Sequence, residues 1–221
     1  MMDKIKISYR ELYERCVLSS IAHAVYTFRE PFFSYEQSWD KKNYSFCVGS
    51  TRGTISFDDT LGVAAGAVRD DKSERIKLYP QKNAYELFEA APAAIIRLAK
   101  DEALEYLYDT IGEVTRPVAT VALWNDGNDV ILSDERSTFV GHGGEFILLL
   151  CDLSVDLGHY WREQYSLSDD ELALVGMLTT AVLNGQTFTL PKNFKKMLKK
   201  SVGLKEGLEA LDELGIDLRK F

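Results

Sequence analysis

The chain has 221 residues, of which 46% are hydrophobic and 27% charged, proportions typical of a folded globular protein and not of a disordered one. Its formal net charge of −8 at pH 7 disfavours nonspecific binding to nucleic acid, because the overall field repels phosphates, and it favours a basic partner. The longest apolar run, Phe146 to Cys151, is far shorter than the roughly 20 residues that cross a bilayer, so no membrane partner is expected.

The first residues and the cysteines indicate a reduced, cytoplasmic chain. Residues 1–7 are short and mixed in character, unlike a secretory signal. Cys16, Cys47 and Cys151 are odd in number and widely spaced, which supports neither a disulfide framework nor a zinc site. The ligand-type residues between positions 151 and 159 match no standard metal-site spacing, so we expect no metal and no other cofactor.

The first third of the chain predicts a helix followed by strands. Ser8 and Glu11 form a capping-box pattern, and the apolar residues after them recur at helical spacing, which predicts a helix over 8–29. The aromatic-rich segment 31–39 begins with a proline and predicts a loop. Residues 44–48, 54–57 and 62–69 are then expected to form an antiparallel meander. The small residues at 64–67 indicate that another element packs closely over the third strand.

The middle of the chain predicts helix and then a hairpin. Asn83 with Glu86 repeats the capping-box logic, and residues 83–111 predict one long helix or one interrupted at Pro92, with Gly112 as its stop. The turn residues 125–128 lie between two runs of strand formers and predict a hairpin of 118–124 with 129–132.

The C-terminal third is expected to be helical. Helices are predicted to begin near Glu145, Ser168, Pro191 and Leu204. The predicted class is therefore α+β, with a central antiparallel sheet packed by helices and a helical C-terminal third. We expect a single domain over 1–221, and a helical subdomain over 160–221 stays open.

Catalytic motifs are absent from the sequence. It contains no G-x-S-x-G, no Walker A loop and no G-x-G-x-x-G. His142 lies in a glycine-rich turn before an apolar helix, where backbone amides could bind an anion, so His142 and Glu145 form the alternative site of an enzyme. A chain reversal that needs positive φ explains the same glycines, and this structural interpretation is favoured. An enzyme is the less favoured class.

A binding surface is the favoured alternative. Residues 39–75 combine aromatic side chains with arginines, the residue types that dominate binding hot spots, and acidic turns could meet a basic partner. The competing interpretation is that Arg52, Arg69 and Arg75 pair with Asp40, Asp70 or Glu74 and tie the meander together. The candidate contact residues are Trp39, Asp40, Tyr44, Arg52, Arg69, Asp126 and Asp129.

Two C-terminal features leave another class open. The lysines of 192–200 lie opposite apolar residues at helical spacing, which indicates a solvated face more than a phosphate site. Leu204, Leu208, Leu211 and Leu218 share one helix face, which a structural or oligomerisation module would use.

Three sequence runs carry a resemblance to a known group of proteins. S-W-D-x-x-N-Y-S, G-x-x-R-G-T-I-S-F and G-A-V-R-D-x-x-S-E-R, within roughly residues 35–76, resemble uncharacterised bacterial proteins of toxin-immunity loci. The resemblance implies a cytosolic inhibitor that binds the toxic domain of a toxin made by the same or a neighbouring bacterium. Such proteins share no catalytic residues, so the resemblance assigns no site.

Overall fold

The computed structural model describes residues 2–40, 42–79, 81–111, 113–216 and 218. They form two compact units: the first comprises Met1–Tyr13 and Lys42–Leu153, and the second comprises Glu14–Lys41 and Ser154–Phe221. The predicted α+β class, with an antiparallel sheet and a helical C-terminal part, is confirmed. The single-domain expectation and the 160–221 subdomain stay predictions.

The first unit is built on an antiparallel sheet with strand order β1-β9-β8-β5-β4-β3. The predicted meander and the hairpin are both present. The strands of this sheet are β1 (Lys4–Lys6), β3 (Asn43–Val48), β4 (Thr51–Asp58), β5 (Val63–Asp70), β8 (Val121–Asn125) and β9 (Asp129–Leu132). Strand β1 was not expected from the sequence; it pairs with β9 at the sheet edge.

Turn chemistry explains where these strands end. After β4, the Asp58 carboxylate accepts hydrogen bonds from the backbone N–H groups of Thr60 and Leu61, at 3.0 and 3.1 Å. After β8, the Asn125 side-chain oxygen accepts from the Gly127 N–H at 2.8 Å, and Gly127 has a φ of +107°. Such side-chain-capped turns and positive-φ glycines reverse the chain at little cost, as the sequence predicted.

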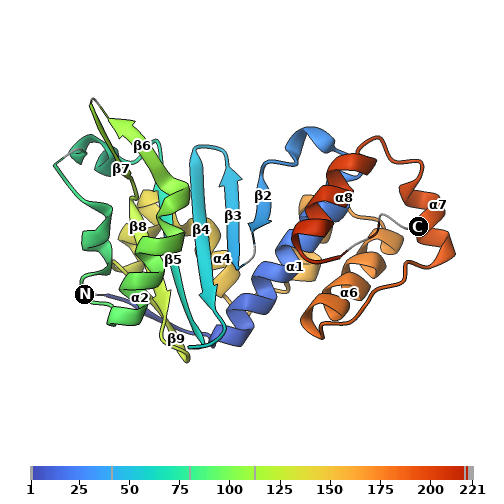
Figure 1. The fold of residues 1–221 in the computed structure, drawn as a ribbon, viewed down its shortest axis with the longest axis horizontal. Helices are drawn as coiled ribbons and strands as arrows, with labels where there is room; N and C mark the ends of the chain where they lie inside the picture. Colours follow the sequence, from blue (N-terminus) through green and yellow to red (C-terminus); the bar gives the residue numbers. More distant parts are fainter. Residues whose placement is uncertain (1, 41, 80, 112, 217, 219–221) are drawn as a thin grey trace. The chain divides into compact units, whose positions relative to one another are not determined.

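One face of the sheet carries small side chains and is covered by helix α2 (Ala93–Leu98), which lies in front of β5 in Figure 1. Ala65, Ala67 and Ala122 on this face pack against Ile95 of α2 in one buried cluster. The expectation that an element lies close over the third strand is therefore confirmed. Small residues permit this close approach because they leave room for the helix.

The expected helix over 83–111 is wrong in its length and at its end. Asn83 does cap a helical turn, accepting from the Tyr85 N–H at 3.1 Å, but that turn, η3, spans only Ala84–Phe88. After α2 come the π-helical turn η4 (Ala99–Ala103) and the 3₁₀ turn η5 (Glu105–Leu107). Strand β6 (Tyr108–Ile111) then pairs with β7 (Val114–Pro117), so tertiary pairing has overridden helix propensity. The stop expected at Gly112 lies outside the described residues.

The opposite face of the sheet carries larger side chains, and helix α4 (Glu145–Cys151) lies behind the strands in Figure 1. Phe146 of α4 contacts Phe46 of β3, with ring centroids 4.6 Å apart. The turn before α4 follows α3 (Arg136–Phe139) and forms η6 (Val140–Gly144), where Gly143 has a φ of +100°. This positive φ is the structural requirement that the glycine-rich turn was expected to meet.

The second unit is mostly helical. Its regular elements are α1 (Tyr9–Thr27) from Glu14 onward, η1 (Pro31–Phe33), β2 (Gln37–Asp40), α5 (Leu157–Gln164), α6 (Asp169–Leu183), α7 (Lys192–Leu198) and α8 (Leu204–Glu213). The capping boxes predicted at Ser8 and Ser168 are both present. The loop expected over 31–39 instead contains η1 and most of β2.

A buried aromatic and polar network holds the second unit together. Tyr165 stacks on Tyr26 and Trp161, with centroids 4.4 and 4.9 Å away. Its hydroxyl accepts a hydrogen bond from Gln37 at 2.9 Å and lies 3.2 Å from Nδ1 of His23. Burial lowers the pKa of His23 to about 4, so the imidazole is neutral at pH 7.

The C-terminal leucine face lies partly within this core. Leu211 and Leu218 are buried, and Gly207 of α8 lies directly against the Phe28 ring, which leaves no space for a side chain there. The face that an oligomerisation module would use is thus largely occupied by the unit's own packing.

Candidate protein-binding surface

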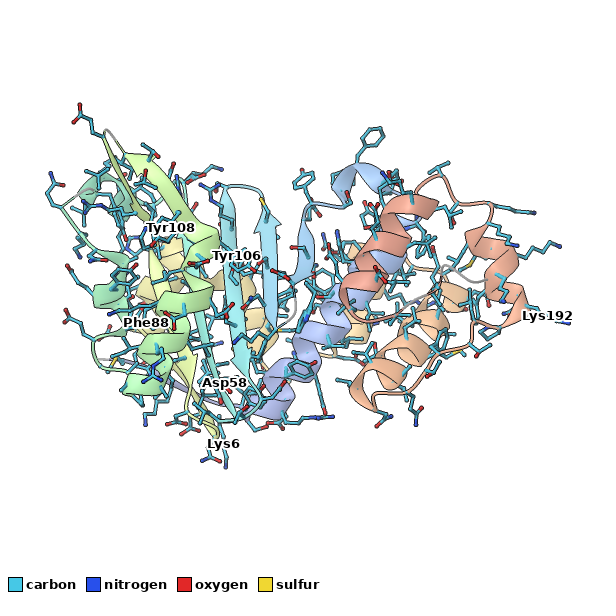
Figure 2. The ribbon with its side chains drawn as sticks, viewed as in Figure 1. Lys6, Asp58, Phe88, Tyr106, Tyr108 and Lys192 are labelled. Carbon is cyan, nitrogen blue, oxygen red and sulfur yellow. The ribbon has the colours of Figure 1, made fainter. Side chains whose placement is uncertain are left out.

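Three tyrosines of η3, η5 and β6 form a candidate contact surface of the first unit. Tyr106 and Tyr108 are 43% and 48% exposed and lie where η5 leads into β6, as Figure 2 shows. Tyr85 of η3 joins them, since its hydroxyl lies 3.2 Å from the Tyr108 hydroxyl. The ammonium of Lys100 lies 5.2 Å from the centre of the Tyr85 ring. We call Tyr85, Tyr106 and Tyr108 the tyrosine face.

The segment that carries the tyrosine face is acidic in sequence. Residues 83–113 contain seven acidic and two basic side chains, a net charge of −5 out of the −8 of the whole chain. The hydrogen bond to Tyr108 and then burial raise the pKa of Tyr85 to about 12, so the Tyr85 hydroxyl remains protonated at neutral pH. Tyrosine rings suit a contact surface because the ring packs against a partner, while the hydroxyl is hydrated when no partner is bound.

Hydrogen bonds fix Tyr106 to the neighbouring strand. The Asn43 side-chain amide donates both to the Tyr106 hydroxyl at 3.2 Å and to the Glu102 carboxylate at 3.0 Å. Glu102 also pairs with Lys42 at 3.2 Å. Because Asn43 is itself buried, this arrangement orders the tyrosine before any partner arrives.

An ion-pair network holds the β6–β7 hairpin in place beneath the tyrosine face. Arg69 of β5 donates through Nε to Asp71 at 2.6 Å, and its Nη1 lies 2.5 Å from the Asp109 carboxylate on β6. The Arg69 hydrogen bond holds the pKa of Asp109 below its ordinary value. Arg69 is therefore a residue that positions the hairpin, consistent with the interpretation that arginines tie the meander together, although the partners are Asp71 and Asp109 and not Asp70.

Several candidate contact residues from the sequence are buried. Trp39 and Tyr44 expose almost no surface, and Tyr44 contacts Phe46 within the first unit. The backbone N–H of Trp39 donates to Glu213 at 2.9 Å within the second unit. Buried rings of this kind contribute packing and cannot form the outer layer of a contact surface.

The remaining candidates are exposed but scattered. Arg52 lies beside Asp71 at 3.9 Å, and Asp40 is exposed at the end of β2. The Asp126 carboxylate accepts from the backbone N–H of Asp129 at 3.2 Å and so shapes the hairpin turn. Asp126 and Asp129 thus have the local role that turn carboxylates ordinarily have.

His142 lies in a polar cluster drawn from distant parts of the first unit. Its Nδ1 is 2.7 Å from the Ser73 hydroxyl, and its carbonyl accepts from the Thr120 hydroxyl at 2.7 Å. The Arg75 guanidinium donates to both carboxylate oxygens of Asp134, at 2.9 and 2.7 Å. It also donates to the Thr120 carbonyl at 2.7 Å. Burial and then Arg75 lower the pKa of His142.

The polar groups of this cluster hydrogen-bond to one another and to the backbone. Ser73 is buried, and its hydroxyl already accepts from the Arg75 N–H at 3.2 Å as the cap of η2 (Glu74–Leu78). Burial opposes ionisation of Asp134, yet the Arg75 bonds hold its pKa below the ordinary value, so the carboxylate is committed to Arg75. A triad needs that carboxylate to orient the imidazole. Glu145, the other alternative residue, is exposed in the first turn of α4.

The ligand-type residues at positions 151–159 have local roles. Asp156 caps α5 by accepting from the His159 N–H at 3.0 Å, and His159 lies 3.3 Å from Glu163. Across the described ranges, no group of three or more histidine, cysteine, aspartate or glutamate side chains is placed to hold a metal ion.

Helices long and apolar enough to cross a bilayer are absent from the part of the chain that the structure describes. Comparison with models of known protein families, with curated proteins and with solved structures gives no match. The candidate surface is therefore argued from this chain's own residues.

Sequence reasoning missed the tyrosine face because it placed Tyr106 and Tyr108 in a helix. A signal was nevertheless present, because the tyrosines at positions 106 and 108 are of a residue type that is enriched in strands. The long-range pairing with β7 that favours strand over helix is not visible in a local window.

Proposed function

We propose that the protein is a cytosolic, non-catalytic inhibitor of the immunity type, which binds and neutralises the toxic domain of a cognate bacterial toxin. The proposal rests on the resemblance of residues 35–76 and on one structural observation, the exposed tyrosines of the acidic segment 83–113. Tyrosine supplies large contact area at low entropic cost, and its hydroxyl bonds a polar partner surface.

The acidic character of the segment 83–113 favours a basic partner. Its net charge of −5 favours a basic domain as partner over nucleic acid, and such an attraction accelerates association. A toxic domain that acts on nucleic acid carries the complementary basic surface, and covering that surface would block its access to substrate. The inhibitor needs no catalytic group for this action.

Co-expression tests the proposal directly. Where the neighbouring gene encodes a secreted protein with a variable C-terminal toxic domain, that domain is induced in bacteria with and without the chain, and survival is counted. We expect the chain to restore growth and to co-purify with the toxic domain in a complex that weakens as salt is raised. Loss of viability despite abundant chain would refute the proposed function.

Matched variants connect the result to the tyrosine face. Tyr106→Ala with Tyr108→Ala should weaken the complex by about 2 kcal/mol or more, because these are hot-spot residue types. Tyr35→Ala, which removes an exposed tyrosine of the second unit, should leave the affinity unchanged. Equal losses from both sets would show that the tyrosine face is not the contact.

A further inference from the structure

The second unit carries a different exposed surface, an apolar patch around η1. Phe32 is 85% exposed and Tyr35 is 66% exposed, and Phe33 lies between them with part of its ring in solvent. Val202, in the loop between α7 and α8, is 80% exposed. Large apolar side chains of this exposure, gathered in one place and rimmed by charges, mark a contact surface. We call Phe32, Phe33, Tyr35 and Val202 the apolar patch.

Gly203 joins the two halves of the patch. Its N–H donates to the Phe28 carbonyl at 2.9 Å, and a Cβ at this position would overlap the Thr27 carbonyl oxygen and approach the Pro31 side chain. Val202 therefore lies beside the start of η1, although about 170 residues separate the two segments in sequence. The contact between Gly203 and Pro31 makes one surface from two segments.

Opposite charges flank the two halves. The aromatic half lies between Glu30 and Glu36, and burial raises the pKa of Glu36. The Val202 half follows Lys199 and Lys200 at the end of the lysine-rich α7, whose Lys192 is labelled at its other end in Figure 2. No acidic residue occurs between Glu171 and Glu206 in the sequence. The patch thus has an acidic rim at one half and a basic rim at the other.

A surface with both signs beside one apolar centre is complementary to itself. A twofold axis through the patch brings the aromatic half of one copy against the Val202 half of another, so that each glutamate rim meets a lysine rim. We infer that the apolar patch is the interface of a symmetric dimer of this chain.

Other occupants fit the charges less well. An anionic membrane would attract Lys199 and Lys200 but repel Glu30 and Glu36 beside the rings that must insert. A partner protein of one charge sign would oppose one of the two rims. A second copy alone satisfies both rims with the same set of residues.

Sedimentation velocity of the purified full-length chain tests the dimer. At concentrations from about 1 to about 100 µM we expect a species of twice the 25.0 kDa chain mass. Phe32→Ser with Val202→Ser should raise the dissociation constant at least thirtyfold, the effect of a hot spot of about 2 kcal/mol. Leu61→Ser, at an exposed leucine of the first unit, should leave the dimer intact.

A charge exchange tests the twofold pairing. Glu36→Lys and Lys200→Glu should each weaken the dimer about tenfold, and the two together in one chain should restore it, because each rim then meets its complement again. Far-UV circular dichroism checks that each variant folds. A monomer at about 100 µM overturns the inference, and so does a monomer that pellets with vesicles of phosphatidylserine and phosphatidylcholine. A dimer that survives Phe32→Ser with Val202→Ser also overturns it.

Discussion

The tyrosine face of the first unit and the apolar patch of the second unit both expose aromatic rings, but they differ in chemistry. The rings of the tyrosine face carry hydroxyls that hydrogen-bond to one another or to Asn43, and the segment 83–113 that carries them has seven acidic and two basic side chains. The apolar patch exposes Phe32 and Val202, whose side chains are wholly apolar. Acidic residues flank the aromatic half of the patch and lysines flank the other half. Polar interfaces suit partners that separate, whereas apolar ones suit lasting association. We therefore propose the first surface as the contact for a toxin and the second as the contact for another copy of the chain.

The interiors of the two units differ as well. The first unit neutralises buried or half-buried arginines with carboxylates, as in the half-buried pair of Arg75 with Asp134 at 2.7 Å. The second unit buries the neutral His23, Gln37 and Tyr165 among stacked rings. These two ways of satisfying buried polar groups respond to pH in different ranges.

The largest effect expected is on pH stability of the second unit. The folded pKa of His23, about 4, lies below its unfolded value of 6.5, so the unfolded chain binds more protons between these values and stability falls as pH drops from 6.5 toward 4. The expected loss is about 3 kcal/mol. In urea titrations across this range, His23→Gln should remove most of the loss.

His142 provides the comparison from the first unit. Its pKa is also lowered, with the same sign of effect, but it is less buried than His23. His142→Gln should therefore remove a smaller part of the loss than His23→Gln does. Equal effects of the two substitutions would show that the second unit does not dominate the loss of stability at acidic pH.

Breaking the ion pair of the first unit has the next largest effect. Arg75→Ala removes the arginine donor from the Asp134 carboxylate, which keeps its hydrogen bond from the Ser133 hydroxyl, and from the Thr120 carbonyl. We expect the free energy of unfolding to fall by about 2 kcal/mol, measured by chemical denaturation at pH 7. Lys77→Ala, which removes an exposed pair with Glu74, should change it by less than about 0.5 kcal/mol.

Substitution of Gly203 tests the close contact that holds Val202 beside η1. Gly203→Ala forces a methyl group into the Thr27 carbonyl, which should cost about 1–2 kcal/mol by thermal or urea unfolding. Gly176→Ala within α6 meets open space and should stabilise by about 0.5–1 kcal/mol. Similar results at both sites would show that Val202 is not held beside η1.

The smallest effect concerns the hydroxyls of the tyrosine face. Tyr108→Phe removes the hydrogen bond that raises the pKa of Tyr85, so that pKa should return toward its ordinary value. The change is followed by ultraviolet titration of tyrosinate absorbance, and stability should change by less than about 1 kcal/mol. A titration that loses only the absorbance of Tyr108, with the pKa of Tyr85 still at about 12, would mean that the two hydroxyls do not interact.

Local sequence signals predicted much of the fold. The capping residues Ser8 and Ser168 and the turn at Asn125 identified α1, α6 and the hairpin, because each of these signals acts within a few residues. The segment 83–111 failed because its alanines, leucines and glutamates have helix propensity, while β6 depends on pairing with β7.

The candidate site was harder to predict than the fold. The sequence placed Trp39 and Tyr44 at the surface, and both are buried. It anticipated that Arg69 and Arg75 pair with carboxylates but could not name Asp109 and Asp134, which tertiary structure brings near. Exposure is a property of packing between distant segments, so composition alone cannot separate a contact arginine from a buried one.

Calorimetry tests the central claim most directly. It measures the affinity of the purified chain, and of two double variants of it, for the toxic domain encoded beside its gene. We predict that Tyr106→Ala with Tyr108→Ala weakens binding at least thirtyfold relative to the unmodified chain, the equivalent of about 2 kcal/mol, and that Phe32→Ser with Val202→Ser leaves the affinity of each chain for the toxic domain unchanged. Tight binding that withstands loss of the tyrosines, or that is lost with Phe32 and Val202, would contradict the assignment of the toxin to the first unit.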